Sequence, residues 1–175
     1  MAVLDARDVA KYRDFGLWLL HELPQLPIRK EKVWRAFQRQ AGDYAGTGIM
    51  PLGGPSIRVD DDILMLCSDD GPPSTQPDGS VIQNQLLRRY GFTVPTRGVN
   101  EIYIARDLAL GALSRQVQPV LEATVLHELV HWCRKVDGED VYDENPPYDF
   151  EREAYGQVVI RTWPSCAPKR IPKRP

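Results

Sequence analysis

The sequence predicts an α+β domain, mostly helical, in which a small antiparallel sheet lies beside one central helix. Residues 117–136 are apolar almost all round at helical spacing, which is typical of a buried helix. Residues 56–67 and 99–105 carry the β-branched and alternating side chains of strands. Amphipathic helical patterns near both ends of the chain supply the elements that pack around the central helix.

Two amphipathic helices are expected in the first forty residues of the chain. Residues 5–23 and 29–40 repeat apolar side chains at helical spacing. These apolar positions are Val9, Tyr12, Leu19, Leu20, Val33, Trp34 and Phe37. His21 lies near the end of the first helix, where a histidine usually caps the helix or faces solvent, so it is expected to have no chemical role.

The middle of the chain alternates loops with short ordered segments. Residues 41–55 are rich in glycine and are expected to form turns. Residues 68–80 contain three prolines, two glycines and three aspartates and are expected to form a loop. The next segment, residues 81–90, is expected to be helical.

The central helix carries the run His127-Glu128-Leu129-Val130-His131, which contains two of the three histidines in the chain. Positions i and i+4 share one face of a helix, so both imidazoles are predicted to point to the same place. Two such imidazoles beside a carboxylate are the pattern of a zinc hydrolase, in which Glu128 acts on a zinc-activated water. The alternative is that two core histidines happen to lie four residues apart.

The third metal ligand is expected on a second helix, at residues 148–160. No histidine follows His131, so the remaining ligand must be a carboxylate or a water. Glu151 shares an inward stripe with Ala154, whereas Glu153 points elsewhere. We therefore predict that Glu151 is the third ligand; a solvated charge or a salt bridge to an arginine is the alternative.

The two helices together resemble those of the gluzincin peptidases. Glu151-Arg152-Glu153-Ala154 matches their E-x-x-A motif, in which the Glu is the third zinc ligand and the small residue lets the helices approach. The resemblance implies one Zn²⁺ per chain, bound by His127, His131 and Glu151. Many gluzincins have Asp after the Ala, as an outer partner of a zinc-bound histidine, and this chain has Tyr155 there.

A narrower resemblance covers residues 99–160. The segments 126–132 and 150–156, joined by an acidic loop, look like the metallopeptidase effector domains of bacterial type VI secretion systems. This resemblance implies an antibacterial zinc metallopeptidase that a dedicated secretion system delivers into a target cell or its periplasm. Its partners would be a protein or peptide substrate, an immunity protein and a secretion spike protein.

Zincins commonly place a strand above the catalytic helix, and the resemblance implies this position for residues 99–105. The exposed edge of such a strand pairs with the extended backbone of the substrate. The alternative for residues 99–105 is an internal strand of the sheet.

In the implied mechanism, Glu128 takes a proton from the water that attacks the peptide carbonyl. A protein donor usually helps the metal to balance the charge that grows on the carbonyl oxygen. Tyr155 is the candidate donor because it lies near Glu151 on the same helix, and Tyr142 and Tyr148 are the alternatives. The predicted catalytic residues are therefore Glu128 and Tyr155.

Two other functions fit the same residues. A zinc ion with an open position could hydrolyse a non-peptide amide, such as a cell-wall crosslink. A zinc-containing domain could also bind proteins without cleaving them, although the presence of Glu128 argues against this. A purely structural zinc site is disfavoured because no cysteine is among the candidate ligands.

The 175 residues are expected to form one zincin-like domain at 1–166 and a disordered basic tail at 167–175. The net charge of −2 gives no reason to expect a nucleic-acid partner. No apolar run is long enough for membrane insertion, and the N-terminus lacks the pattern of a secretory signal. Cys133 is expected to be a core thiol, although it could pair with Cys166 in an oxidising compartment.

Overall fold

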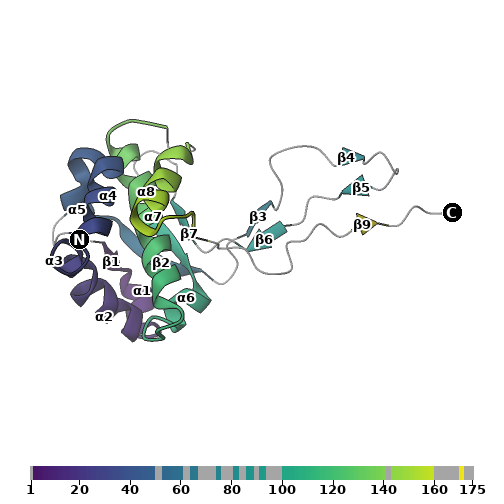
Figure 1. The fold of residues 1–175 in the computed structure, drawn as a ribbon. Helices are drawn as coiled ribbons and strands as arrows, with labels where there is room; N and C mark the ends of the chain where they lie inside the picture. The colour runs from purple at the N-terminus through teal and green to yellow at the C-terminus, as the bar shows by residue number, and fades with distance from the viewer. Residues whose placement is uncertain are drawn as a thin grey trace.

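The structure is a computed structural model, and it describes residues 2–49, 53–60, 64–66, 74–75, 81–82, 86–88, 91–93, 100–140, 143–159 and 170–171. Helices and strands are mixed along the chain, so the predicted α+β class is confirmed. Figure 1 shows the helices gathered around one sheet, with further short strands lying apart from them.

The main sheet has four strands in the order β1-β2-β8-β7. They are β1 (Val3–Leu4), β2 (Ser56–Asp60), β7 (Gly91–Thr93) and β8 (Glu101–Ala105). Strand β2 is parallel to both β1 and β8, and only β7 is antiparallel to its neighbour β8. The expectation of an antiparallel sheet was therefore wrong. Parallel neighbours need a long connection, and long stretches of chain separate β1 from β2 and β2 from β8.

Five further strands form two small antiparallel sheets. Strand β3 (Leu64–Leu66) pairs with β6 (Leu86–Arg88), and β5 (Val81–Ile82) pairs with both β4 (Ser74–Thr75) and β9 (Arg170–Ile171). The helix expected at residues 81–90 was therefore wrong where the structure describes this segment. A short apolar run is compatible with either a helix or a strand. In this segment, pairing with neighbouring strands determines that it forms strands.

The helices before the second strand agree with the predicted pattern in part. They are α1 (Ala6–Val9), α2 (Arg13–His21), α3 (Leu26–Arg29), α4 (Glu31–Ala41) and α5 (Ala45–Ile49), with 3₁₀ turns at Leu23–Gln25 and Gly42–Tyr44. The single helix expected at 5–23 is interrupted between α1 and α2. The turns expected at 41–55 include α5, which packs against the central helix.

The remaining helices are α6 (Arg106–Leu110), α7 (Gln118–Val136) and α8 (Asn145–Tyr155). Every residue of α7 from 121 to 133 is buried, as the apolar pattern predicted. Helix α7 contacts α4, α5, α6 and α8 as well as strands β7 and β8. Figure 1 shows α7 and α8 side by side, with α4 and α5 next to them. Helix α7 is therefore the centre of the core.

Helix α8 begins and ends earlier than the expected range of 148–160. Pro146 and Pro147 lie in its first turn, where a proline is tolerated because the amide groups there have no partner within the helix. The helix ends at Gly156, which has a φ of 81° that favours glycine. The rings of Phe150 on α8 and Phe37 on α4 meet edge to face at 6.1 Å, which fixes α8 against α4.

None of the described helices is both long enough and apolar enough to cross a membrane. Of the tail expected at 167–175, the structure describes only Arg170–Ile171, which forms β9. The division of the chain into a domain at 1–166 and a tail stays a prediction.

Candidate metal centre

His127 and His131 lie on one face of α7, as their spacing predicted. Their ring centroids are 5.0 Å apart, and both residues are buried, with exposed fractions of 6% and 5%. Buried imidazoles need polar partners, because an unpaired polar group is costly in a low-dielectric interior. The partners of these two rings therefore indicate what the site is built to bind.

Glu144 brings a carboxylate to both histidines. Its Oε2 lies 3.2 Å from Nε2 of His127 and 3.5 Å from Nε2 of His131. Within the described part of the chain, these three residues form a cluster whose ligand atoms all lie within 4.8 Å of one another. In a tetrahedral zinc site with bonds of about 2.1 Å, neighbouring ligand atoms are about 3.4 Å apart. The spacing of the three side chains therefore suits one small divalent ion.

The histidines also set the charge of Glu144. Burial alone would raise the pKa of this carboxyl group, but hydrogen bonds and positive charge from His127 and His131 outweigh burial and hold the pKa well below its usual range. Glu144 is consequently an anion, which is the form that binds a metal. Glu144 stands at the N-terminal cap of α8, so the start of this helix fixes its place.

Glu151, the ligand predicted from the sequence, lies on the other side of His127. Its Oε1 is 2.6 Å from Nδ1 of His127, and its Oε2 accepts a hydrogen bond of 2.7 Å from the backbone N–H of Val159. A carboxylate accepts hydrogen bonds, so Nδ1 carries a proton, and Nε2, on the side where Glu144 lies, is the nitrogen that would give up its proton to bind a metal. Glu151 is thus placed to orient the ring of His127, and it is not part of the three-residue cluster.

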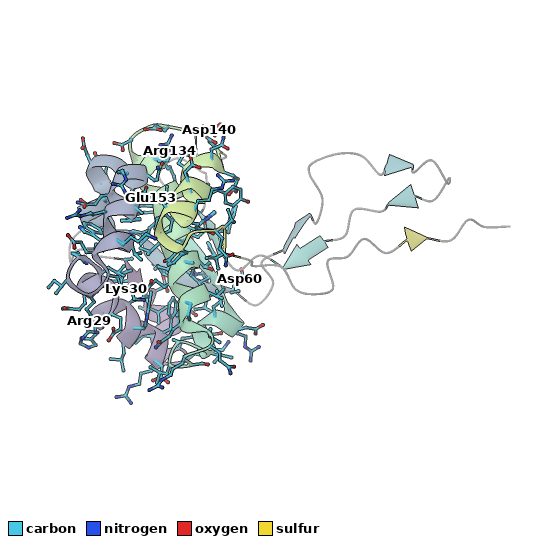
Figure 2. The ribbon with its side chains drawn as sticks, viewed as in Figure 1. Arg29, Lys30, Asp60, Arg134, Asp140 and Glu153 are labelled. Carbon is cyan, nitrogen blue, oxygen red and sulfur yellow. The ribbon has the colours of Figure 1, made fainter. Side chains whose placement is uncertain are left out.

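Glu153, the less favoured candidate, faces α4. Its carboxylate forms an ion pair with Arg39 and accepts a hydrogen bond of 3.0 Å from Nε of that residue. Figure 2 labels Glu153 on α8. Its position agrees with the prediction that Glu153 points away from the histidines.

Glu128 is buried against strand β7. The hydroxyl of Thr93 lies 2.9 Å from Oε2 of Glu128 and 2.9 Å from its backbone oxygen. A Cβ atom at Gly91 would lie 2.7 Å from Cγ of Glu128, closer than real Cβ atoms come. Gly91 and Thr93 are two residues apart and so share one face of β7. Together they form a cradle for the Glu128 side chain, which the sequence did not predict.

Tyr155, the predicted donor, points to a different partner. Its hydroxyl lies 3.3 Å from Oε1 of Glu122, and the other oxygen of Glu122 pairs with Nζ of Lys30 at 2.7 Å. Figure 2 labels Lys30 among the N-terminal helices. Tyr148, one of the two alternatives, packs its ring 5.6 Å from the ring of His127. The other alternative, Tyr142, lies outside the described residues.

The strand predicted at 99–105 forms β8 and lies inside the sheet. Strands β2 and β7 flank it on both sides, so the alternative of an internal strand is confirmed. The edge strand next to the central helix is β7 instead.

Cys133 is a buried free thiol, as expected of a core residue. Burial raises the pKa of this thiol far above its usual range. Cys67 and Cys166 lie outside the described residues, so a disulfide with Cys166 stays a prediction.

Comparison with known proteins identifies one family. A family model described as metallopeptidase toxin 3 matches residues 8–156, which is most of the chain and includes α7, α8 and the main-sheet strands β2, β7 and β8. No curated protein and no solved structure is similar enough to count as a match.

Proposed function

Because the chain belongs to the metallopeptidase toxin 3 family, we propose that it is a zinc-dependent peptidase with His127, His131 and Glu144 as metal ligands and Glu128 as general base. The observation that carries this proposal is the convergence of two Nε2 atoms and the Glu144 carboxylate at ligand spacing, with Glu128 on the helix that carries both histidines. Membership of the family already identifies a metallopeptidase toxin. The identity of the metal as zinc and the roles of the individual residues go beyond what the family shows.

The donor set favours zinc in a catalytic site. Two imidazoles and one carboxylate suit zinc, and three protein ligands leave one position open for water or substrate. Zinc bound there supplies a Lewis acid that activates water and polarises the peptide carbonyl. Closed structural sites instead use four protein ligands that usually include cysteine, and the cluster contains none.

Glu128 is the residue that moves the proton. It lies next to His127 in the sequence, and its carboxylate is buried and held by the hydroxyl of Thr93. A fixed carboxylate on the helix that carries both histidines can accept the proton of the attacking water and pass it to the leaving amine. Because Glu128 is held in one orientation, it need not reorganise during the reaction. A preorganised site gains much of its rate advantage in this way.

This assignment replaces the predicted ligand and the predicted donor. We give the third ligand position to Glu144, because Glu151 is bonded to the far nitrogen of His127. Glu151 then orients the ring and strengthens it as a ligand. We give the donor role to Tyr148, whose ring lies against that of His127, because the hydroxyl of Tyr155 is bonded to Glu122.

The biological setting extends the proposal. We infer an antibacterial effector that cleaves proteins after delivery by a type VI or similar secretion system. An immunity protein in the producing cell and a spike protein that carries the domain are the partners of such a system. The family supports a peptidase toxin in general terms, and these finer points follow from the resemblance of the HExxH and E-x-x-A segments.

The metal content of purified variants tests the ligand set. The wild type is expected to bind about one zinc per chain. His131→Ala and Glu144→Gln should lose it, whereas Glu151→Gln should weaken binding by only about 10- to 100-fold, as expected for an outer partner. Glu153→Gln, which changes a carboxylate on the same helix that faces away from the cluster, is the matched control and should bind like the wild type.

Two results would overturn this assignment. If the wild type binds no zinc even when zinc is supplied in excess, the metal site is wrong. If Glu144→Gln binds zinc like the wild type while Glu151→Gln loses it, Glu151 is the ligand and Glu144 is not.

A further inference from the structure

The chain turns back on itself immediately after α8. Gly156 has a φ of 81°, and its N–H bonds to the backbone oxygen of Arg152 at 2.9 Å. The following residues return toward the helix, and the N–H of Val159 reaches Oε2 of Glu151, eight positions earlier, at 2.7 Å. Residues 156–159, which we call the returning segment, therefore contact the helix through this main-chain hydrogen bond.

Glu151 is the residue that links the returning segment to the metal centre. Its side chain has no exposed surface, so its carboxylate must obtain hydrogen bonds from the protein. One oxygen is bonded to Nδ1 of His127 and the other to the N–H of Val159. If the Val159 donor is removed, a buried carboxylate oxygen loses a partner, and the carboxylate can rotate away from the histidine.

We propose that the returning segment supports the metal site, because its main chain holds Glu151 in the orientation that positions His127. This inference rests on the proposed metal centre and extends it beyond the helices that carry the ligands. Glu151 acts through His127, and Val159 acts through Glu151, so both are positioning residues. The affinity for zinc consequently depends on whether the returning segment keeps its hydrogen bond to Glu151.

A pair of substitutions at Val159 separates the main chain from the side chain. Val159→Pro removes the N–H donor, because proline has none, while Val159→Ala keeps the donor and removes most of the side chain. Zinc affinity is measured by competition with a chromogenic chelator. Loss of an outer partner of a metal ligand weakens binding by about 10- to 100-fold, so Val159→Pro should weaken it by about tenfold. Val159→Ala should stay within about twofold of the wild type.

The same substitution in a second background shows whether the effect passes through Glu151. In Glu151→Ala the carboxylate is absent, so Val159→Pro should cause little further loss of zinc affinity. Thermal unfolding of the metal-free proteins, followed by circular dichroism, monitors the fold of each variant. An equal loss of affinity in both backgrounds would mean that proline acts by general disruption, and the inference would then be wrong.

The linkage must also run in the opposite direction. If docking of the returning segment strengthens zinc binding, zinc must strengthen docking, so hydrogen exchange at the Val159 amide should slow when zinc is added to the wild type. Exchange that zinc leaves unchanged, or Val159→Pro with wild-type affinity, would overturn the inference. Neither result would affect the proposed ligand set, which depends on Glu144→Gln and His131→Ala.

Discussion

The cradle around Glu128 can be tested by adding a single methyl group. In Gly91→Ala, the new Cβ would lie 2.7 Å from Cγ and 2.8 Å from Oε1 of Glu128, and 2.8 Å from Cγ2 of Thr124. Ordinary contacts between such atoms are about 3.5–4.0 Å, so each neighbour would have to move by about 0.7 Å or more. Thr124 cannot turn away freely, because its hydroxyl donates to the backbone oxygen of Val120 at 2.7 Å.

These contacts indicate how much stability and activity Gly91→Ala should lose. Overpacking a tightly packed interior destabilises a protein by about 1–3 kcal/mol, and a clash with three atoms places Gly91→Ala at about 2 kcal/mol. Two of the three atoms belong to Glu128, so its carboxylate must also leave its place beside Thr93. A displacement of about 1 Å in a catalytic group lowers the rate by about 100-fold, and we expect a loss of that order in peptide hydrolysis.

A double-mutant cycle provides the assay. Urea unfolding is measured on four metal-free proteins: the wild type, Gly91→Ala, Glu128→Ala and the double variant. Glu128→Ala removes two of the three atoms nearest to the new Cβ, so Gly91→Ala should be less destabilising there by about 1 kcal/mol or more. An equal destabilisation in both backgrounds would refute the claim that strand β7 is shaped around the Glu128 side chain.

Three further predictions concern single side chains. Glu128→Gln should retain zinc and lose peptide hydrolysis, because an amide cannot accept the proton of the water. Metal content and turnover are measured on the same preparation. Turnover at the wild-type rate would show that Glu128 is not the general base. Tyr155→Phe should cost about 1 kcal/mol of stability through the lost bond to Glu122 and leave kcat unchanged, and a 100-fold fall in kcat would restore Tyr155 as the donor. Hydrogen bonds from Arg7 hold the pKa of Asp5 well below its ordinary value, so the ionised form stabilises the fold above the unfolded pKa of about 4. The difference in urea stability between the wild type and Asp5→Asn should therefore be present at pH 7 and shrink as the pH falls below about 4, whereas a difference that does not change with pH would contradict this account.

The sequence was sufficient for the parts of the site that depend on local periodicity. The positions of His127 and His131 follow from helical spacing alone, and the apolar pattern around them correctly predicted a buried helix. Glu144 could not be found in the same way, because it lies in the acidic loop and its place depends on where α8 begins. A carboxylate directly before an Asn-Pro-Pro helix start was the available signal.

The roles of Glu151 and Thr93 needed the three-dimensional structure. Periodicity correctly distinguished Glu151 from Glu153 as the inward carboxylate, but it cannot show which nitrogen of His127 the carboxylate meets. Thr93 reaches Glu128 only through the pairing of β7 with β8, and no local pattern encodes that contact. The parallel pairing of β2 with β1 and β8 was missed for the same reason, because pairing between distant segments decides it.

The burial of Cys133 bears on how the protein would tolerate different redox environments. A thiol reacts with oxidants mainly as its thiolate, and the raised pKa and full burial of Cys133 keep it protonated and out of reach. Cys133 lies two residues after His131, so oxidation there would disturb the helix that carries both histidines. Its burial therefore shields the geometry of α7 from small oxidants such as oxidised glutathione.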